Sequence, residues 1–162
     1  MSHAPSASIA REFRAISLVG FGHFLSHFYM FGLVPLFVAI STEFEVTNLQ
    51  LGAILTAYNV ATGVLQTPMG ILVDKLGAKR VLVSGLLITS AAFALSGFTT
   101  SYWELLALFF IAGAGNSVFH PADYVILTAS VEESRQGRAY SMHSFGGSLG
   151  TAAGPAVMVM LM

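Results

Sequence analysis

Histidine is the residue type in this sequence that is best suited to chemistry, because an imidazole changes its charge near neutral pH. Four of the five histidines fall inside long apolar stretches, where an ionisable side chain is costly and indicates a function. They are His23 and His27, four residues apart, and His120 and His143. Asp123 follows His120 by three residues, so the two would share one face of a helix. We therefore predict a proton or substrate pathway at His23, His27, His120, Asp123 and His143.

Two other interpretations of these residues stay open at this point. Each histidine could have a structural role, as a donor to a backbone carbonyl or at a packed helix contact. A divalent transition metal is the second alternative, because His23, His27, His120 and Asp123 are ligand types that such ions accept. Nothing in the sequence shows that the ring nitrogens converge, so we predict neither a metal nor a cofactor. The chain has no cysteine, and no nucleophile–base–acid set points to an enzyme.

Membrane-spanning helices are the elements that must hold these side chains. The sequence is 55% hydrophobic and only 9% charged, whereas soluble domains have about 25% charged residues. A spanning helix needs about 20 mostly apolar residues, and the sequence contains five such stretches without the alternation of a barrel. The predicted fold class is therefore an all-α membrane protein, with transmembrane helices at about 15–40, 49–72, 81–99, 103–127 and 139–162. Residues 1–14 are predicted to form an N-terminal tail.

Positive charges predict the orientation of these helices. All seven lysines and arginines lie before the first helix or in every second connection. These residues are Arg11, Arg14, Lys75, Lys79, Arg80, Arg135 and Arg138. By the positive-inside rule, the N-terminus and residues 1–14 are cytoplasmic. The first helix could be a signal peptide, but it is longer than the apolar core of one and lacks a small-residue cleavage site.

The connection after the second helix carries the most specific motif, in the run GILVDKLGAKR. It resembles the cytoplasmic loop motif of the major facilitator superfamily, and its residues are Gly70, Asp74, Lys75, Gly77, Lys79 and Arg80. A glycine at 70 permits close helix approach and one at 77 suits a tight turn. The carboxylate of Asp74 could latch one conformation through a base or a helix N-terminus. Ala78 stands where the family often has a base, and an ordinary cytoplasmic loop is the alternative.

Small residues at four-residue spacing predict close helix packing in the last two helices. Gly113 and Ser117 form such a face in the fourth helix. The fifth helix carries Gly146, Gly150 and Gly154, followed by Pro155. Its last part resembles the antiporter motif of the superfamily, although the later glycines of that motif are absent.

A branch of the superfamily is indicated by GAGNSVFHPADY and SRQGRAYSMHSFGGSLGTAAGP. These runs resemble fosmidomycin-resistance-type transporters, and the similarity extends over nearly the whole chain. The resemblance implies a twelve-helix efflux antiporter, of which this chain holds five helices of an incomplete six-helix N-terminal bundle. It also implies that His23, His27, His120 and Asp123 meet at the central cavity. The arginine that many drug/proton antiporters carry in the fourth helix is replaced by Phe109.

The predicted function is secondary active transport of a small molecule by alternating access, as proton-coupled efflux across the inner membrane. Expected partners are the lipid bilayer, the substrate, protons and the remaining helices of the full-length transporter. The absence of a basic cluster argues against nucleic acid. Uptake of an ion or organic anion by symport is one alternative. A membrane scaffold or assembly subunit that does not transport is another, since the chain ends inside an apolar run.

Overall fold

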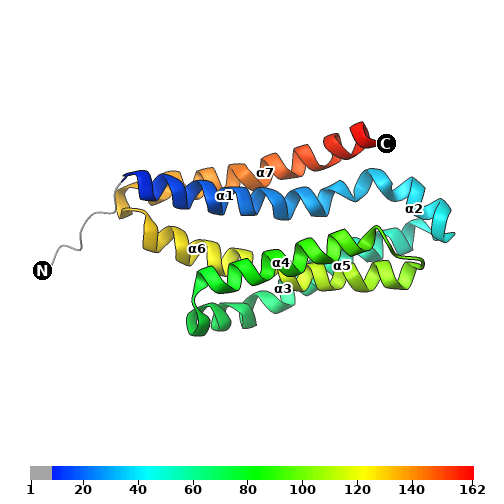
Figure 1. The fold of residues 1–162 in the computed structure, drawn as a ribbon, viewed down its shortest axis with the longest axis horizontal. Helices are drawn as coiled ribbons and strands as arrows, with labels where there is room; N and C mark the ends of the chain where they lie inside the picture. The colour runs from blue at the N-terminus through cyan, green and yellow to red at the C-terminus, as the bar shows by residue number, and fades with distance from the viewer. Residues whose placement is uncertain (1–8) are drawn as a thin grey trace, which may run out of the picture.

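The protein is described here by a computed structural model, which covers residues 9–162. Residues 1–8 of the predicted tail lie outside the described residues, and the first helix begins at Ile9, earlier than expected. From residue 9 onward the secondary structure is helical without strands, which confirms the all-α fold class (Figure 1). The elements are α1 (Ile9–Gly32), η1 (Val34–Leu36), α2 (Phe37–Phe44), α3 (Asn48–Leu76), α4 (Ala78–Ser96), α5 (Tyr102–Asn116), α6 (Phe119–Ser130), η2 (Glu133–Arg135) and α7 (Gln136–Leu161).

Four helical segments are long and apolar enough to cross a membrane, among the residues that the structure describes. They run over Ile9–Phe44, Ala78–Ser96, Tyr102–Ser130 and Glu133–Leu161. Helix α3 has 29 residues but is not in this set, because side chains such as Asn59 and Gln66 lower its apolar character. Its crossing of the membrane remains a prediction.

Prolines explain why two of the predicted helices are interrupted. Proline has no backbone N–H and clashes with the carbonyl four residues earlier. Pro121 places this clash at Ser117, and α5 gives way to α6 at that point. Pro35 lies in the short 3₁₀ turn between α1 and α2. By contrast, Pro68 and Pro155 lie within continuous helices.

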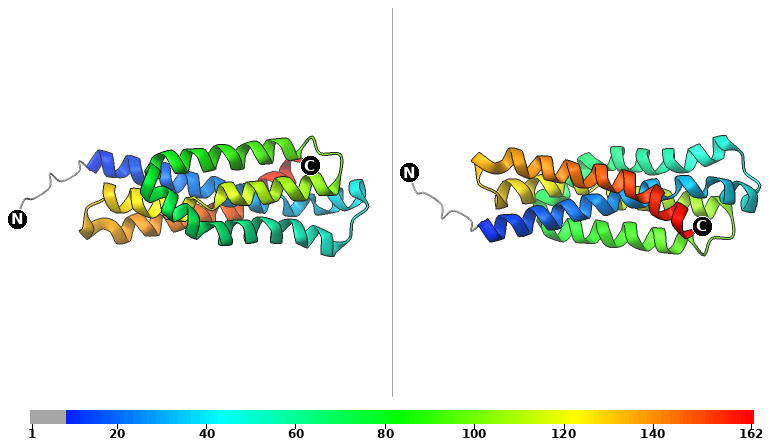
Figure 2. Two further views of the ribbon diagram at one scale, coloured as in Figure 1. Left: turned by 90° about the horizontal axis from the view of Figure 1, so that it is seen from below. Right: turned by 90° about the horizontal axis from the view of Figure 1, so that it is seen from above.

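The helices form two groups that run along the same long axis, as Figures 1 and 2 show. Helix α7 lies along α1, and the two run in the same direction. Helix α5 packs between α3 and α4, and α6 continues from α5 toward the α1–α7 pair. Because α6 contacts α1, α4 and α7, side chains from the two groups can meet there.

Glycines allow the α1–α7 pair to approach closely. A Cβ atom at Gly146 would lie 2.5 Å from the carbonyl oxygen of Gly20, and one at Gly154 would lie 2.6 Å from that of Phe28. A Cβ at Gly150 would collide with the carbonyl of Phe24. Distances this short leave no room for a methyl group at these positions. The main chains of α1 and α7 are therefore in direct contact along this interface.

The second group is built in a similar way around an aromatic core. A Cβ at Gly113 would collide with the backbone of Tyr58, so α5 and α3 also touch through their main chains. Phe109 is fully buried in this core, with its ring centroid 5.0 Å from that of Phe93. An arginine at position 109 would be a buried charge here, and phenylalanine fills the space instead. Ser117, the other small residue of the predicted face, is buried and donates to the carbonyl of Ala114.

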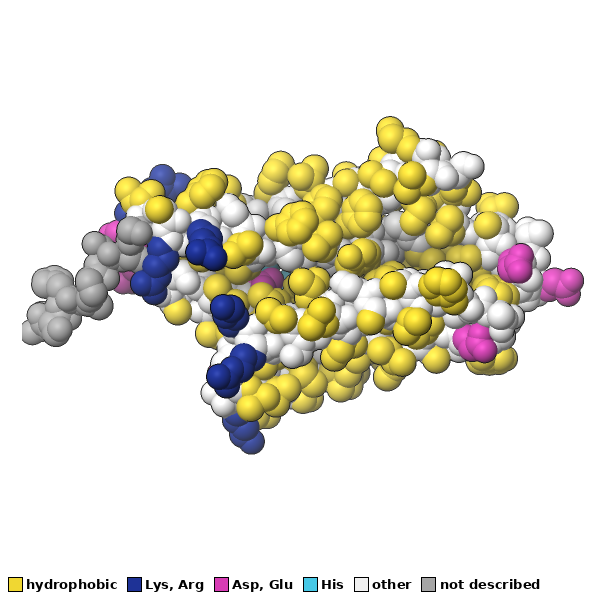
Figure 3. Space-filling view, viewed as in Figure 1, with side chains coloured by type: hydrophobic (Ala, Val, Ile, Leu, Met, Phe, Trp, Pro, Cys, Tyr) yellow, Lys and Arg dark blue, Asp and Glu magenta, His cyan; other side chains and the backbone are white. Residues whose placement is uncertain are grey.

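Lysine and arginine side chains gather at one end of the molecule, and the charged side chains visible at the other end are acidic, as Figure 3 shows. Lysines and arginines lie at the end where α1 begins and α3 turns into α4. Acidic residues of the α2–α3 connection and the start of α5 lie at the other end. The apolar side chains between the two ends face outward, as expected of helices surrounded by lipid. The structure is therefore that of an integral membrane protein.

Candidate functional site: a buried histidine cluster

The four histidines predicted from the sequence lie together in the structure. The ring centroid of His23 is 4.0 Å from that of His143, 4.7 Å from that of His27 and 5.4 Å from that of His120. The rings of His23 and His143 are stacked, with 8° between their planes. They come from α1, α6 and α7, and Asp123 of α6 joins them. We call these five residues the histidine cluster.

Helix α1 contributes two imidazoles that are hydrogen-bonded to each other and to groups of α7. The Nδ1 atom of His23 donates to the carbonyl oxygen of His143, at 3.0 Å. Its Nε2 atom is 3.2 Å from Nε2 of His27. The Nδ1 atom of His27 is in turn 3.0 Å from Oγ1 of Thr151. His23 is buried, whereas His27 is half-buried.

Asp123 is paired with α7 and not with its neighbour on α6. Its Oδ2 atom is 2.9 Å from Nε2 of His143, and both side chains are buried. The spacing in the sequence associated Asp123 with His120, but Pro121 stands between these residues at the first turn of α6. Within residues 9–162, the Oδ1 atom of Asp123 and the Nδ1 atom of His120 are buried without a hydrogen-bond partner. A buried ionisable group with spare bonding capacity is suited to bind and release a proton.

Two residues of the site were missed by sequence reasoning. Thr151 faces His27, and its hydroxyl also lies 3.1 Å from the carbonyl oxygen of Gly147. A Cβ atom at Gly147 would lie 2.6 Å from Cε1 of His23, so only glycine leaves room for this ring. The four-residue glycine repeat of α7 predicted a close contact at Gly146. The adjacent glycine at 147 could have indicated a second close contact, the one with His23.

No metal centre accompanies the cluster in the described part of the chain. The structure contains no group of three or more histidine, cysteine, aspartate or glutamate side chains placed to hold a metal ion between residues 9 and 162. The nitrogens of His23 and His27 are engaged in hydrogen bonds with each other, with a carbonyl and with a hydroxyl. The arrangement therefore suits proton binding better than metal ligation.

The loop motif after α3 lies at the cationic end of the bundle. Gly77 has φ 89°, a backbone conformation that favours glycine, and it forms the turn between α3 and α4. Gly70 has no atom within 4 Å of a Cβ built on it, from the residues that are described. Asp74, Lys75, Lys79 and Arg80 are exposed, and the contacts described for residues 9–162 include no ion pair between them. A latch partner for Asp74 is therefore not among the described residues.

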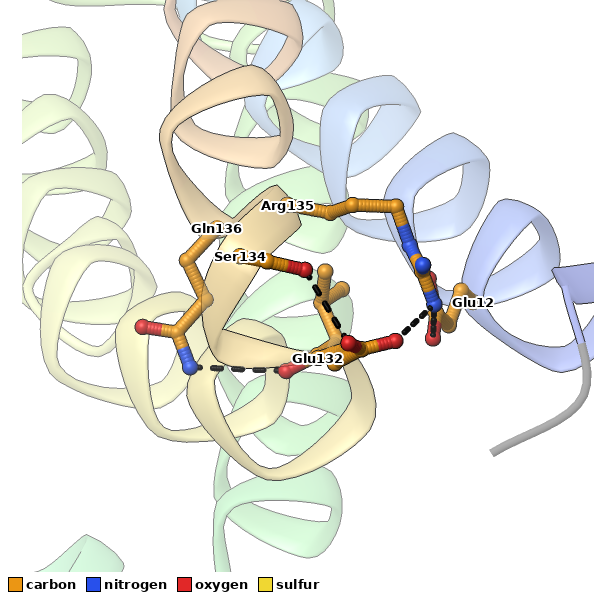
Figure 4. A network of polar contacts seen from close by, with 6 residues as sticks. Glu12, Glu132, Ser134, Arg135 and Gln136 are labelled. Carbon is orange, nitrogen blue, oxygen red and sulfur yellow. Dashed lines mark hydrogen bonds and ion pairs between the residues drawn. The ribbon is translucent and has the colours of Figure 1, made fainter. Parts of the chain in front are cut away.

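An ion-pair network at the same end joins the start of α1 to the start of α7 (Figure 4). The guanidinium of Arg135 donates to both carboxylate oxygens of Glu12, at 2.9 Å and 2.6 Å. It also forms an ion pair with Glu132, at 2.7 Å. Glu12 is only 4% exposed, although the sequence placed it in the tail. A bidentate pair of this kind has a defined geometry, so it ties α1 to the start of α7, two of the three helices that carry the cluster.

Similarity to known proteins identifies the family of this chain. Residues 19–162 match the family described as Major Facilitator Superfamily. The chain is 26% identical to the fosmidomycin resistance protein of Escherichia coli (strain K12) over 159 residues, which are 98% of this chain and 39% of that protein. It is 25% identical to the uncharacterized MFS-type transporter YfnC of Bacillus subtilis (strain 168), over 90% of this chain and 35% of that protein. It is also 29% identical to the multidrug resistance protein MdtH of Citrobacter koseri, over 52% of this chain and 21% of that protein.

These relatives confirm two sequence-based predictions, the superfamily and the similarity to its fosmidomycin-resistance branch. The chain spans about two fifths of the length of the first of them. The family is one of transporters and not of enzymes. With its lipid-facing helices, its buried polar cluster and its match over residues 19–162, the chain belongs to the Major Facilitator Superfamily.

Proposed function

We propose that this chain forms part of a secondary transporter that exports a small molecule by alternating access, driven by protons. The observation that carries the proposal is the histidine cluster, in which imidazoles from α1, α6 and α7 lie together and one of them, His143, is hydrogen-bonded to the buried carboxylate of Asp123. Imidazole gains and loses a proton near neutral pH, so the cluster can load and unload protons during a transport cycle. Relatives with resistance in their names support export as the direction.

The orientation of the chain in the membrane is part of the same proposal. The end with Arg11, Arg14, Lys79 and Arg80 faces the cytoplasm, and the membrane is the inner membrane of a bacterium. The positive-inside rule supports this orientation, since the opposite connections carry only acidic charges. The remaining helices of the complete transporter would supply the other wall of the substrate pathway.

Uptake is the second candidate, and one relative favours it. The chain is 22% identical to the probable L-galactonate transporter of Escherichia coli (strain K12), over 77% of this chain and 28% of that protein. In a symporter the cluster would load the proton together with the substrate. Export and uptake therefore differ in the direction of the pH change that a substrate gradient produces.

The test measures substrate-driven pH change in proteoliposomes that contain the protein as its gene encodes it. A panel of antibiotics that includes fosmidomycin and a panel of sugar acids serve as probes. We expect proton movement opposite to the substrate with an antibiotic, and at least tenfold slower proton movement in Asp123→Asn and His143→Gln, about 1.4 kcal/mol of coupling. Ser141→Ala is the control, because Ser141 lies on α7, is exposed and bonds only within its own helix.

Two results would contradict the proposal. A wild-type protein that transports a probe without moving protons would exclude proton coupling. Unchanged proton flux in both Asp123→Asn and His143→Gln would remove the cluster from the mechanism. Proton movement with a sugar acid in the same direction as the substrate would favour the uptake alternative.

A further inference from the structure

A continuous chain of hydrogen bonds links α1 to α7 through His23, His27 and Thr151. It begins at the carbonyl oxygen of His143, which accepts from Nδ1 of His23. It continues from His23 Nε2 to His27 Nε2, and from His27 Nδ1 to the Thr151 hydroxyl. It ends where that hydroxyl donates to the carbonyl oxygen of Gly147. The chain therefore consists of four hydrogen bonds between two fixed acceptors, and its hydrogens can be counted.

Two neutral imidazoles cannot make all four bonds. A carbonyl only accepts, so the one ring hydrogen of neutral His23 must sit on Nδ1, which leaves its Nε2 bare. His27 must then donate from Nε2, which leaves its own Nδ1 bare. The Thr151 hydroxyl has a single hydrogen, which can satisfy either His27 Nδ1 or the carbonyl of Gly147. In the neutral state one of the four bonds is always missing.

One additional proton completes the chain. If it binds at Nδ1 of His27, this atom donates to the oxygen of Thr151, and the Thr151 hydrogen is free to donate to Gly147. The hydrogen between the two Nε2 atoms can then lie on either ring without breaking a bond of the chain, so the two rings share a single positive charge. His27 is the half-buried member of the pair, and His23 is the buried one. The proton therefore enters at the more accessible ring.

We propose that His23 and His27 together form the binding site of the transported proton, and that Thr151 is the hydroxyl that turns when this proton binds. The inference rests on the proposed function, in which protons drive transport. The proton comes from water on one side of the membrane and returns to water on the other. Its binding makes one N–H bond at His27, and the Thr151 hydroxyl turns from His27 to Gly147.

The groups around the pair are compatible with one shared charge and not with two. His143 of α7 stacks on His23, and His120 of α6 lies edge-on to it. The only carboxylate of the cluster, Asp123, contacts His143 and not the pair itself. The lysines and arginines of the described chain lie at the cationic end. A second proton on His23 and His27 would therefore meet no counter-charge within hydrogen-bond distance.

Substitutions of His27 and Thr151 test the proposal in the proteoliposome assay described above. The His27→Gln side chain keeps a donor toward His23 but cannot take up a proton. We expect it to carry substrate down its gradient without proton movement. Thr151→Val removes the acceptor that the protonated pair needs, and a missing partner costs a charged group more than a neutral one. We expect the half-maximal pH of proton-coupled transport to move to more acidic values by about one unit.

Matched variants control for changes in packing. Thr151→Ser keeps the hydroxyl and should keep the wild-type pH profile. Thr56→Val is the second control, because Thr56 also donates to a carbonyl four residues earlier, that of Gly52, and contacts no histidine. Thermal unfolding in detergent shows whether each variant folds. If Thr151→Val does not fold, nitrogen-15 NMR of labelled histidine in the wild-type protein should show uptake of one proton by the His23–His27 pair.

The outcomes separate this inference from the proposed function. Wild-type coupling that persists unchanged in His27→Gln and Thr151→Val overturns the inference and leaves proton-driven transport standing. Independent protonation of the two rings in the NMR titration overturns it as well. A wild-type protein without any substrate-driven proton movement overturns both. Loss of coupling in His27→Gln, with an acidic shift in Thr151→Val and none in Thr151→Ser, supports it.

Discussion

His23 is the central residue of the histidine cluster, because its ring contacts three other imidazoles and a backbone carbonyl. It stacks on His143, meets His27 and His120 at its edges, and donates to the main chain of α7. Its position depends on Gly147, the residue of α7 that it covers. A single methyl group at position 147 is therefore the smallest change that should disturb the cluster.

We predict that Gly147→Ala displaces the His23 ring and weakens proton coupling. The added Cβ would lie 2.6 Å from Cε1 and 2.9 Å from Nδ1 of His23, which is closer than atoms pack. Overpacking of this kind costs about 1–3 kcal/mol of the free energy of unfolding. Proton flux in proteoliposomes and the midpoint of thermal unfolding measure the two effects.

Gly137→Ala is the matched control for this change. It lies on the same helix, and a Cβ built on it has no atom within 4 Å. Alanine is a better helix former than glycine, so this variant should be as stable as the wild type or more stable, by about 1 kcal/mol. Wild-type coupling and stability in Gly147→Ala would show that the His23 ring is free to move.

At the scale of the elements, the α1–α7 pair is the unit that carries the proposed proton site. Its glycine contacts bring two main chains together, but glycines leave few side chains that interlock and resist sliding. Polar contacts therefore contribute to the register of the two helices. The histidine hydrogen bonds do so within the bundle, and the pair of Arg135 with Glu12 does so at the cationic end.

We predict that Arg135→Gln loosens the start of α1 without unfolding the bundle. Loss of the guanidinium leaves the buried carboxylate of Glu12 without its cationic partner. Backbone amides in residues 9–20 should then exchange with deuterium at least threefold faster, an effect of about 0.6 kcal/mol on local opening. The change is measured by hydrogen exchange and mass spectrometry in lipid.

Two variants control for the loss of charge at this end. Arg138→Gln removes an exposed arginine and should leave the exchange of α1 unchanged. The double variant Glu12→Arg with Arg135→Glu restores an ion pair with the acidic and basic residues exchanged. It should slow the hydrogen exchange of α1 again. Equal exchange in Arg135→Gln and Arg138→Gln would show that the network does not hold α1.

At the scale of the whole molecule, charge and shape are arranged along one axis. Cationic side chains lie at one end together with some acidic ones, such as Glu12 and Glu132, and the charged side chains visible at the other end are acidic. Apolar side chains between the two ends face outward. The histidine cluster lies inside this apolar zone, where α6 reaches the α1–α7 pair. A proton that reaches it must pass through protein and not through lipid.

The proposed orientation predicts which end can be labelled from outside the cell. The chain has no cysteine, so a single introduced cysteine reports its own position. We expect Glu43→Cys to react with a membrane-impermeant maleimide in intact cells, and Lys75→Cys to react only after the cells are opened. Both residues are exposed, so neither result should be limited by burial. The reverse pattern would place the N-terminus outside.

Local properties of the sequence were enough to predict the all-α fold class, the placement of the lysines and arginines and the presence of histidines within long apolar stretches. These properties depend on the length of apolar runs and on the order of residues along the chain. A proline by itself does not predict a break, because Pro121 accompanies the change from α5 to α6 whereas Pro68 and Pro155 lie within continuous helices.

Only the tertiary structure decided which groups meet across helices. It paired Asp123 with His143, set Thr151 against His27, fitted Gly147 to His23 and joined Glu12 to Arg135. Residues in three of these contacts are more than 100 positions apart in the sequence, and no local pattern specifies which helix faces which. Helix rotation and register arise from all the close contacts of the α1–α7 interface together. The sequence by itself could therefore place histidines within the apolar stretches, but it could not predict the chain of hydrogen bonds in which the neutral His23–His27 pair lacks one hydrogen.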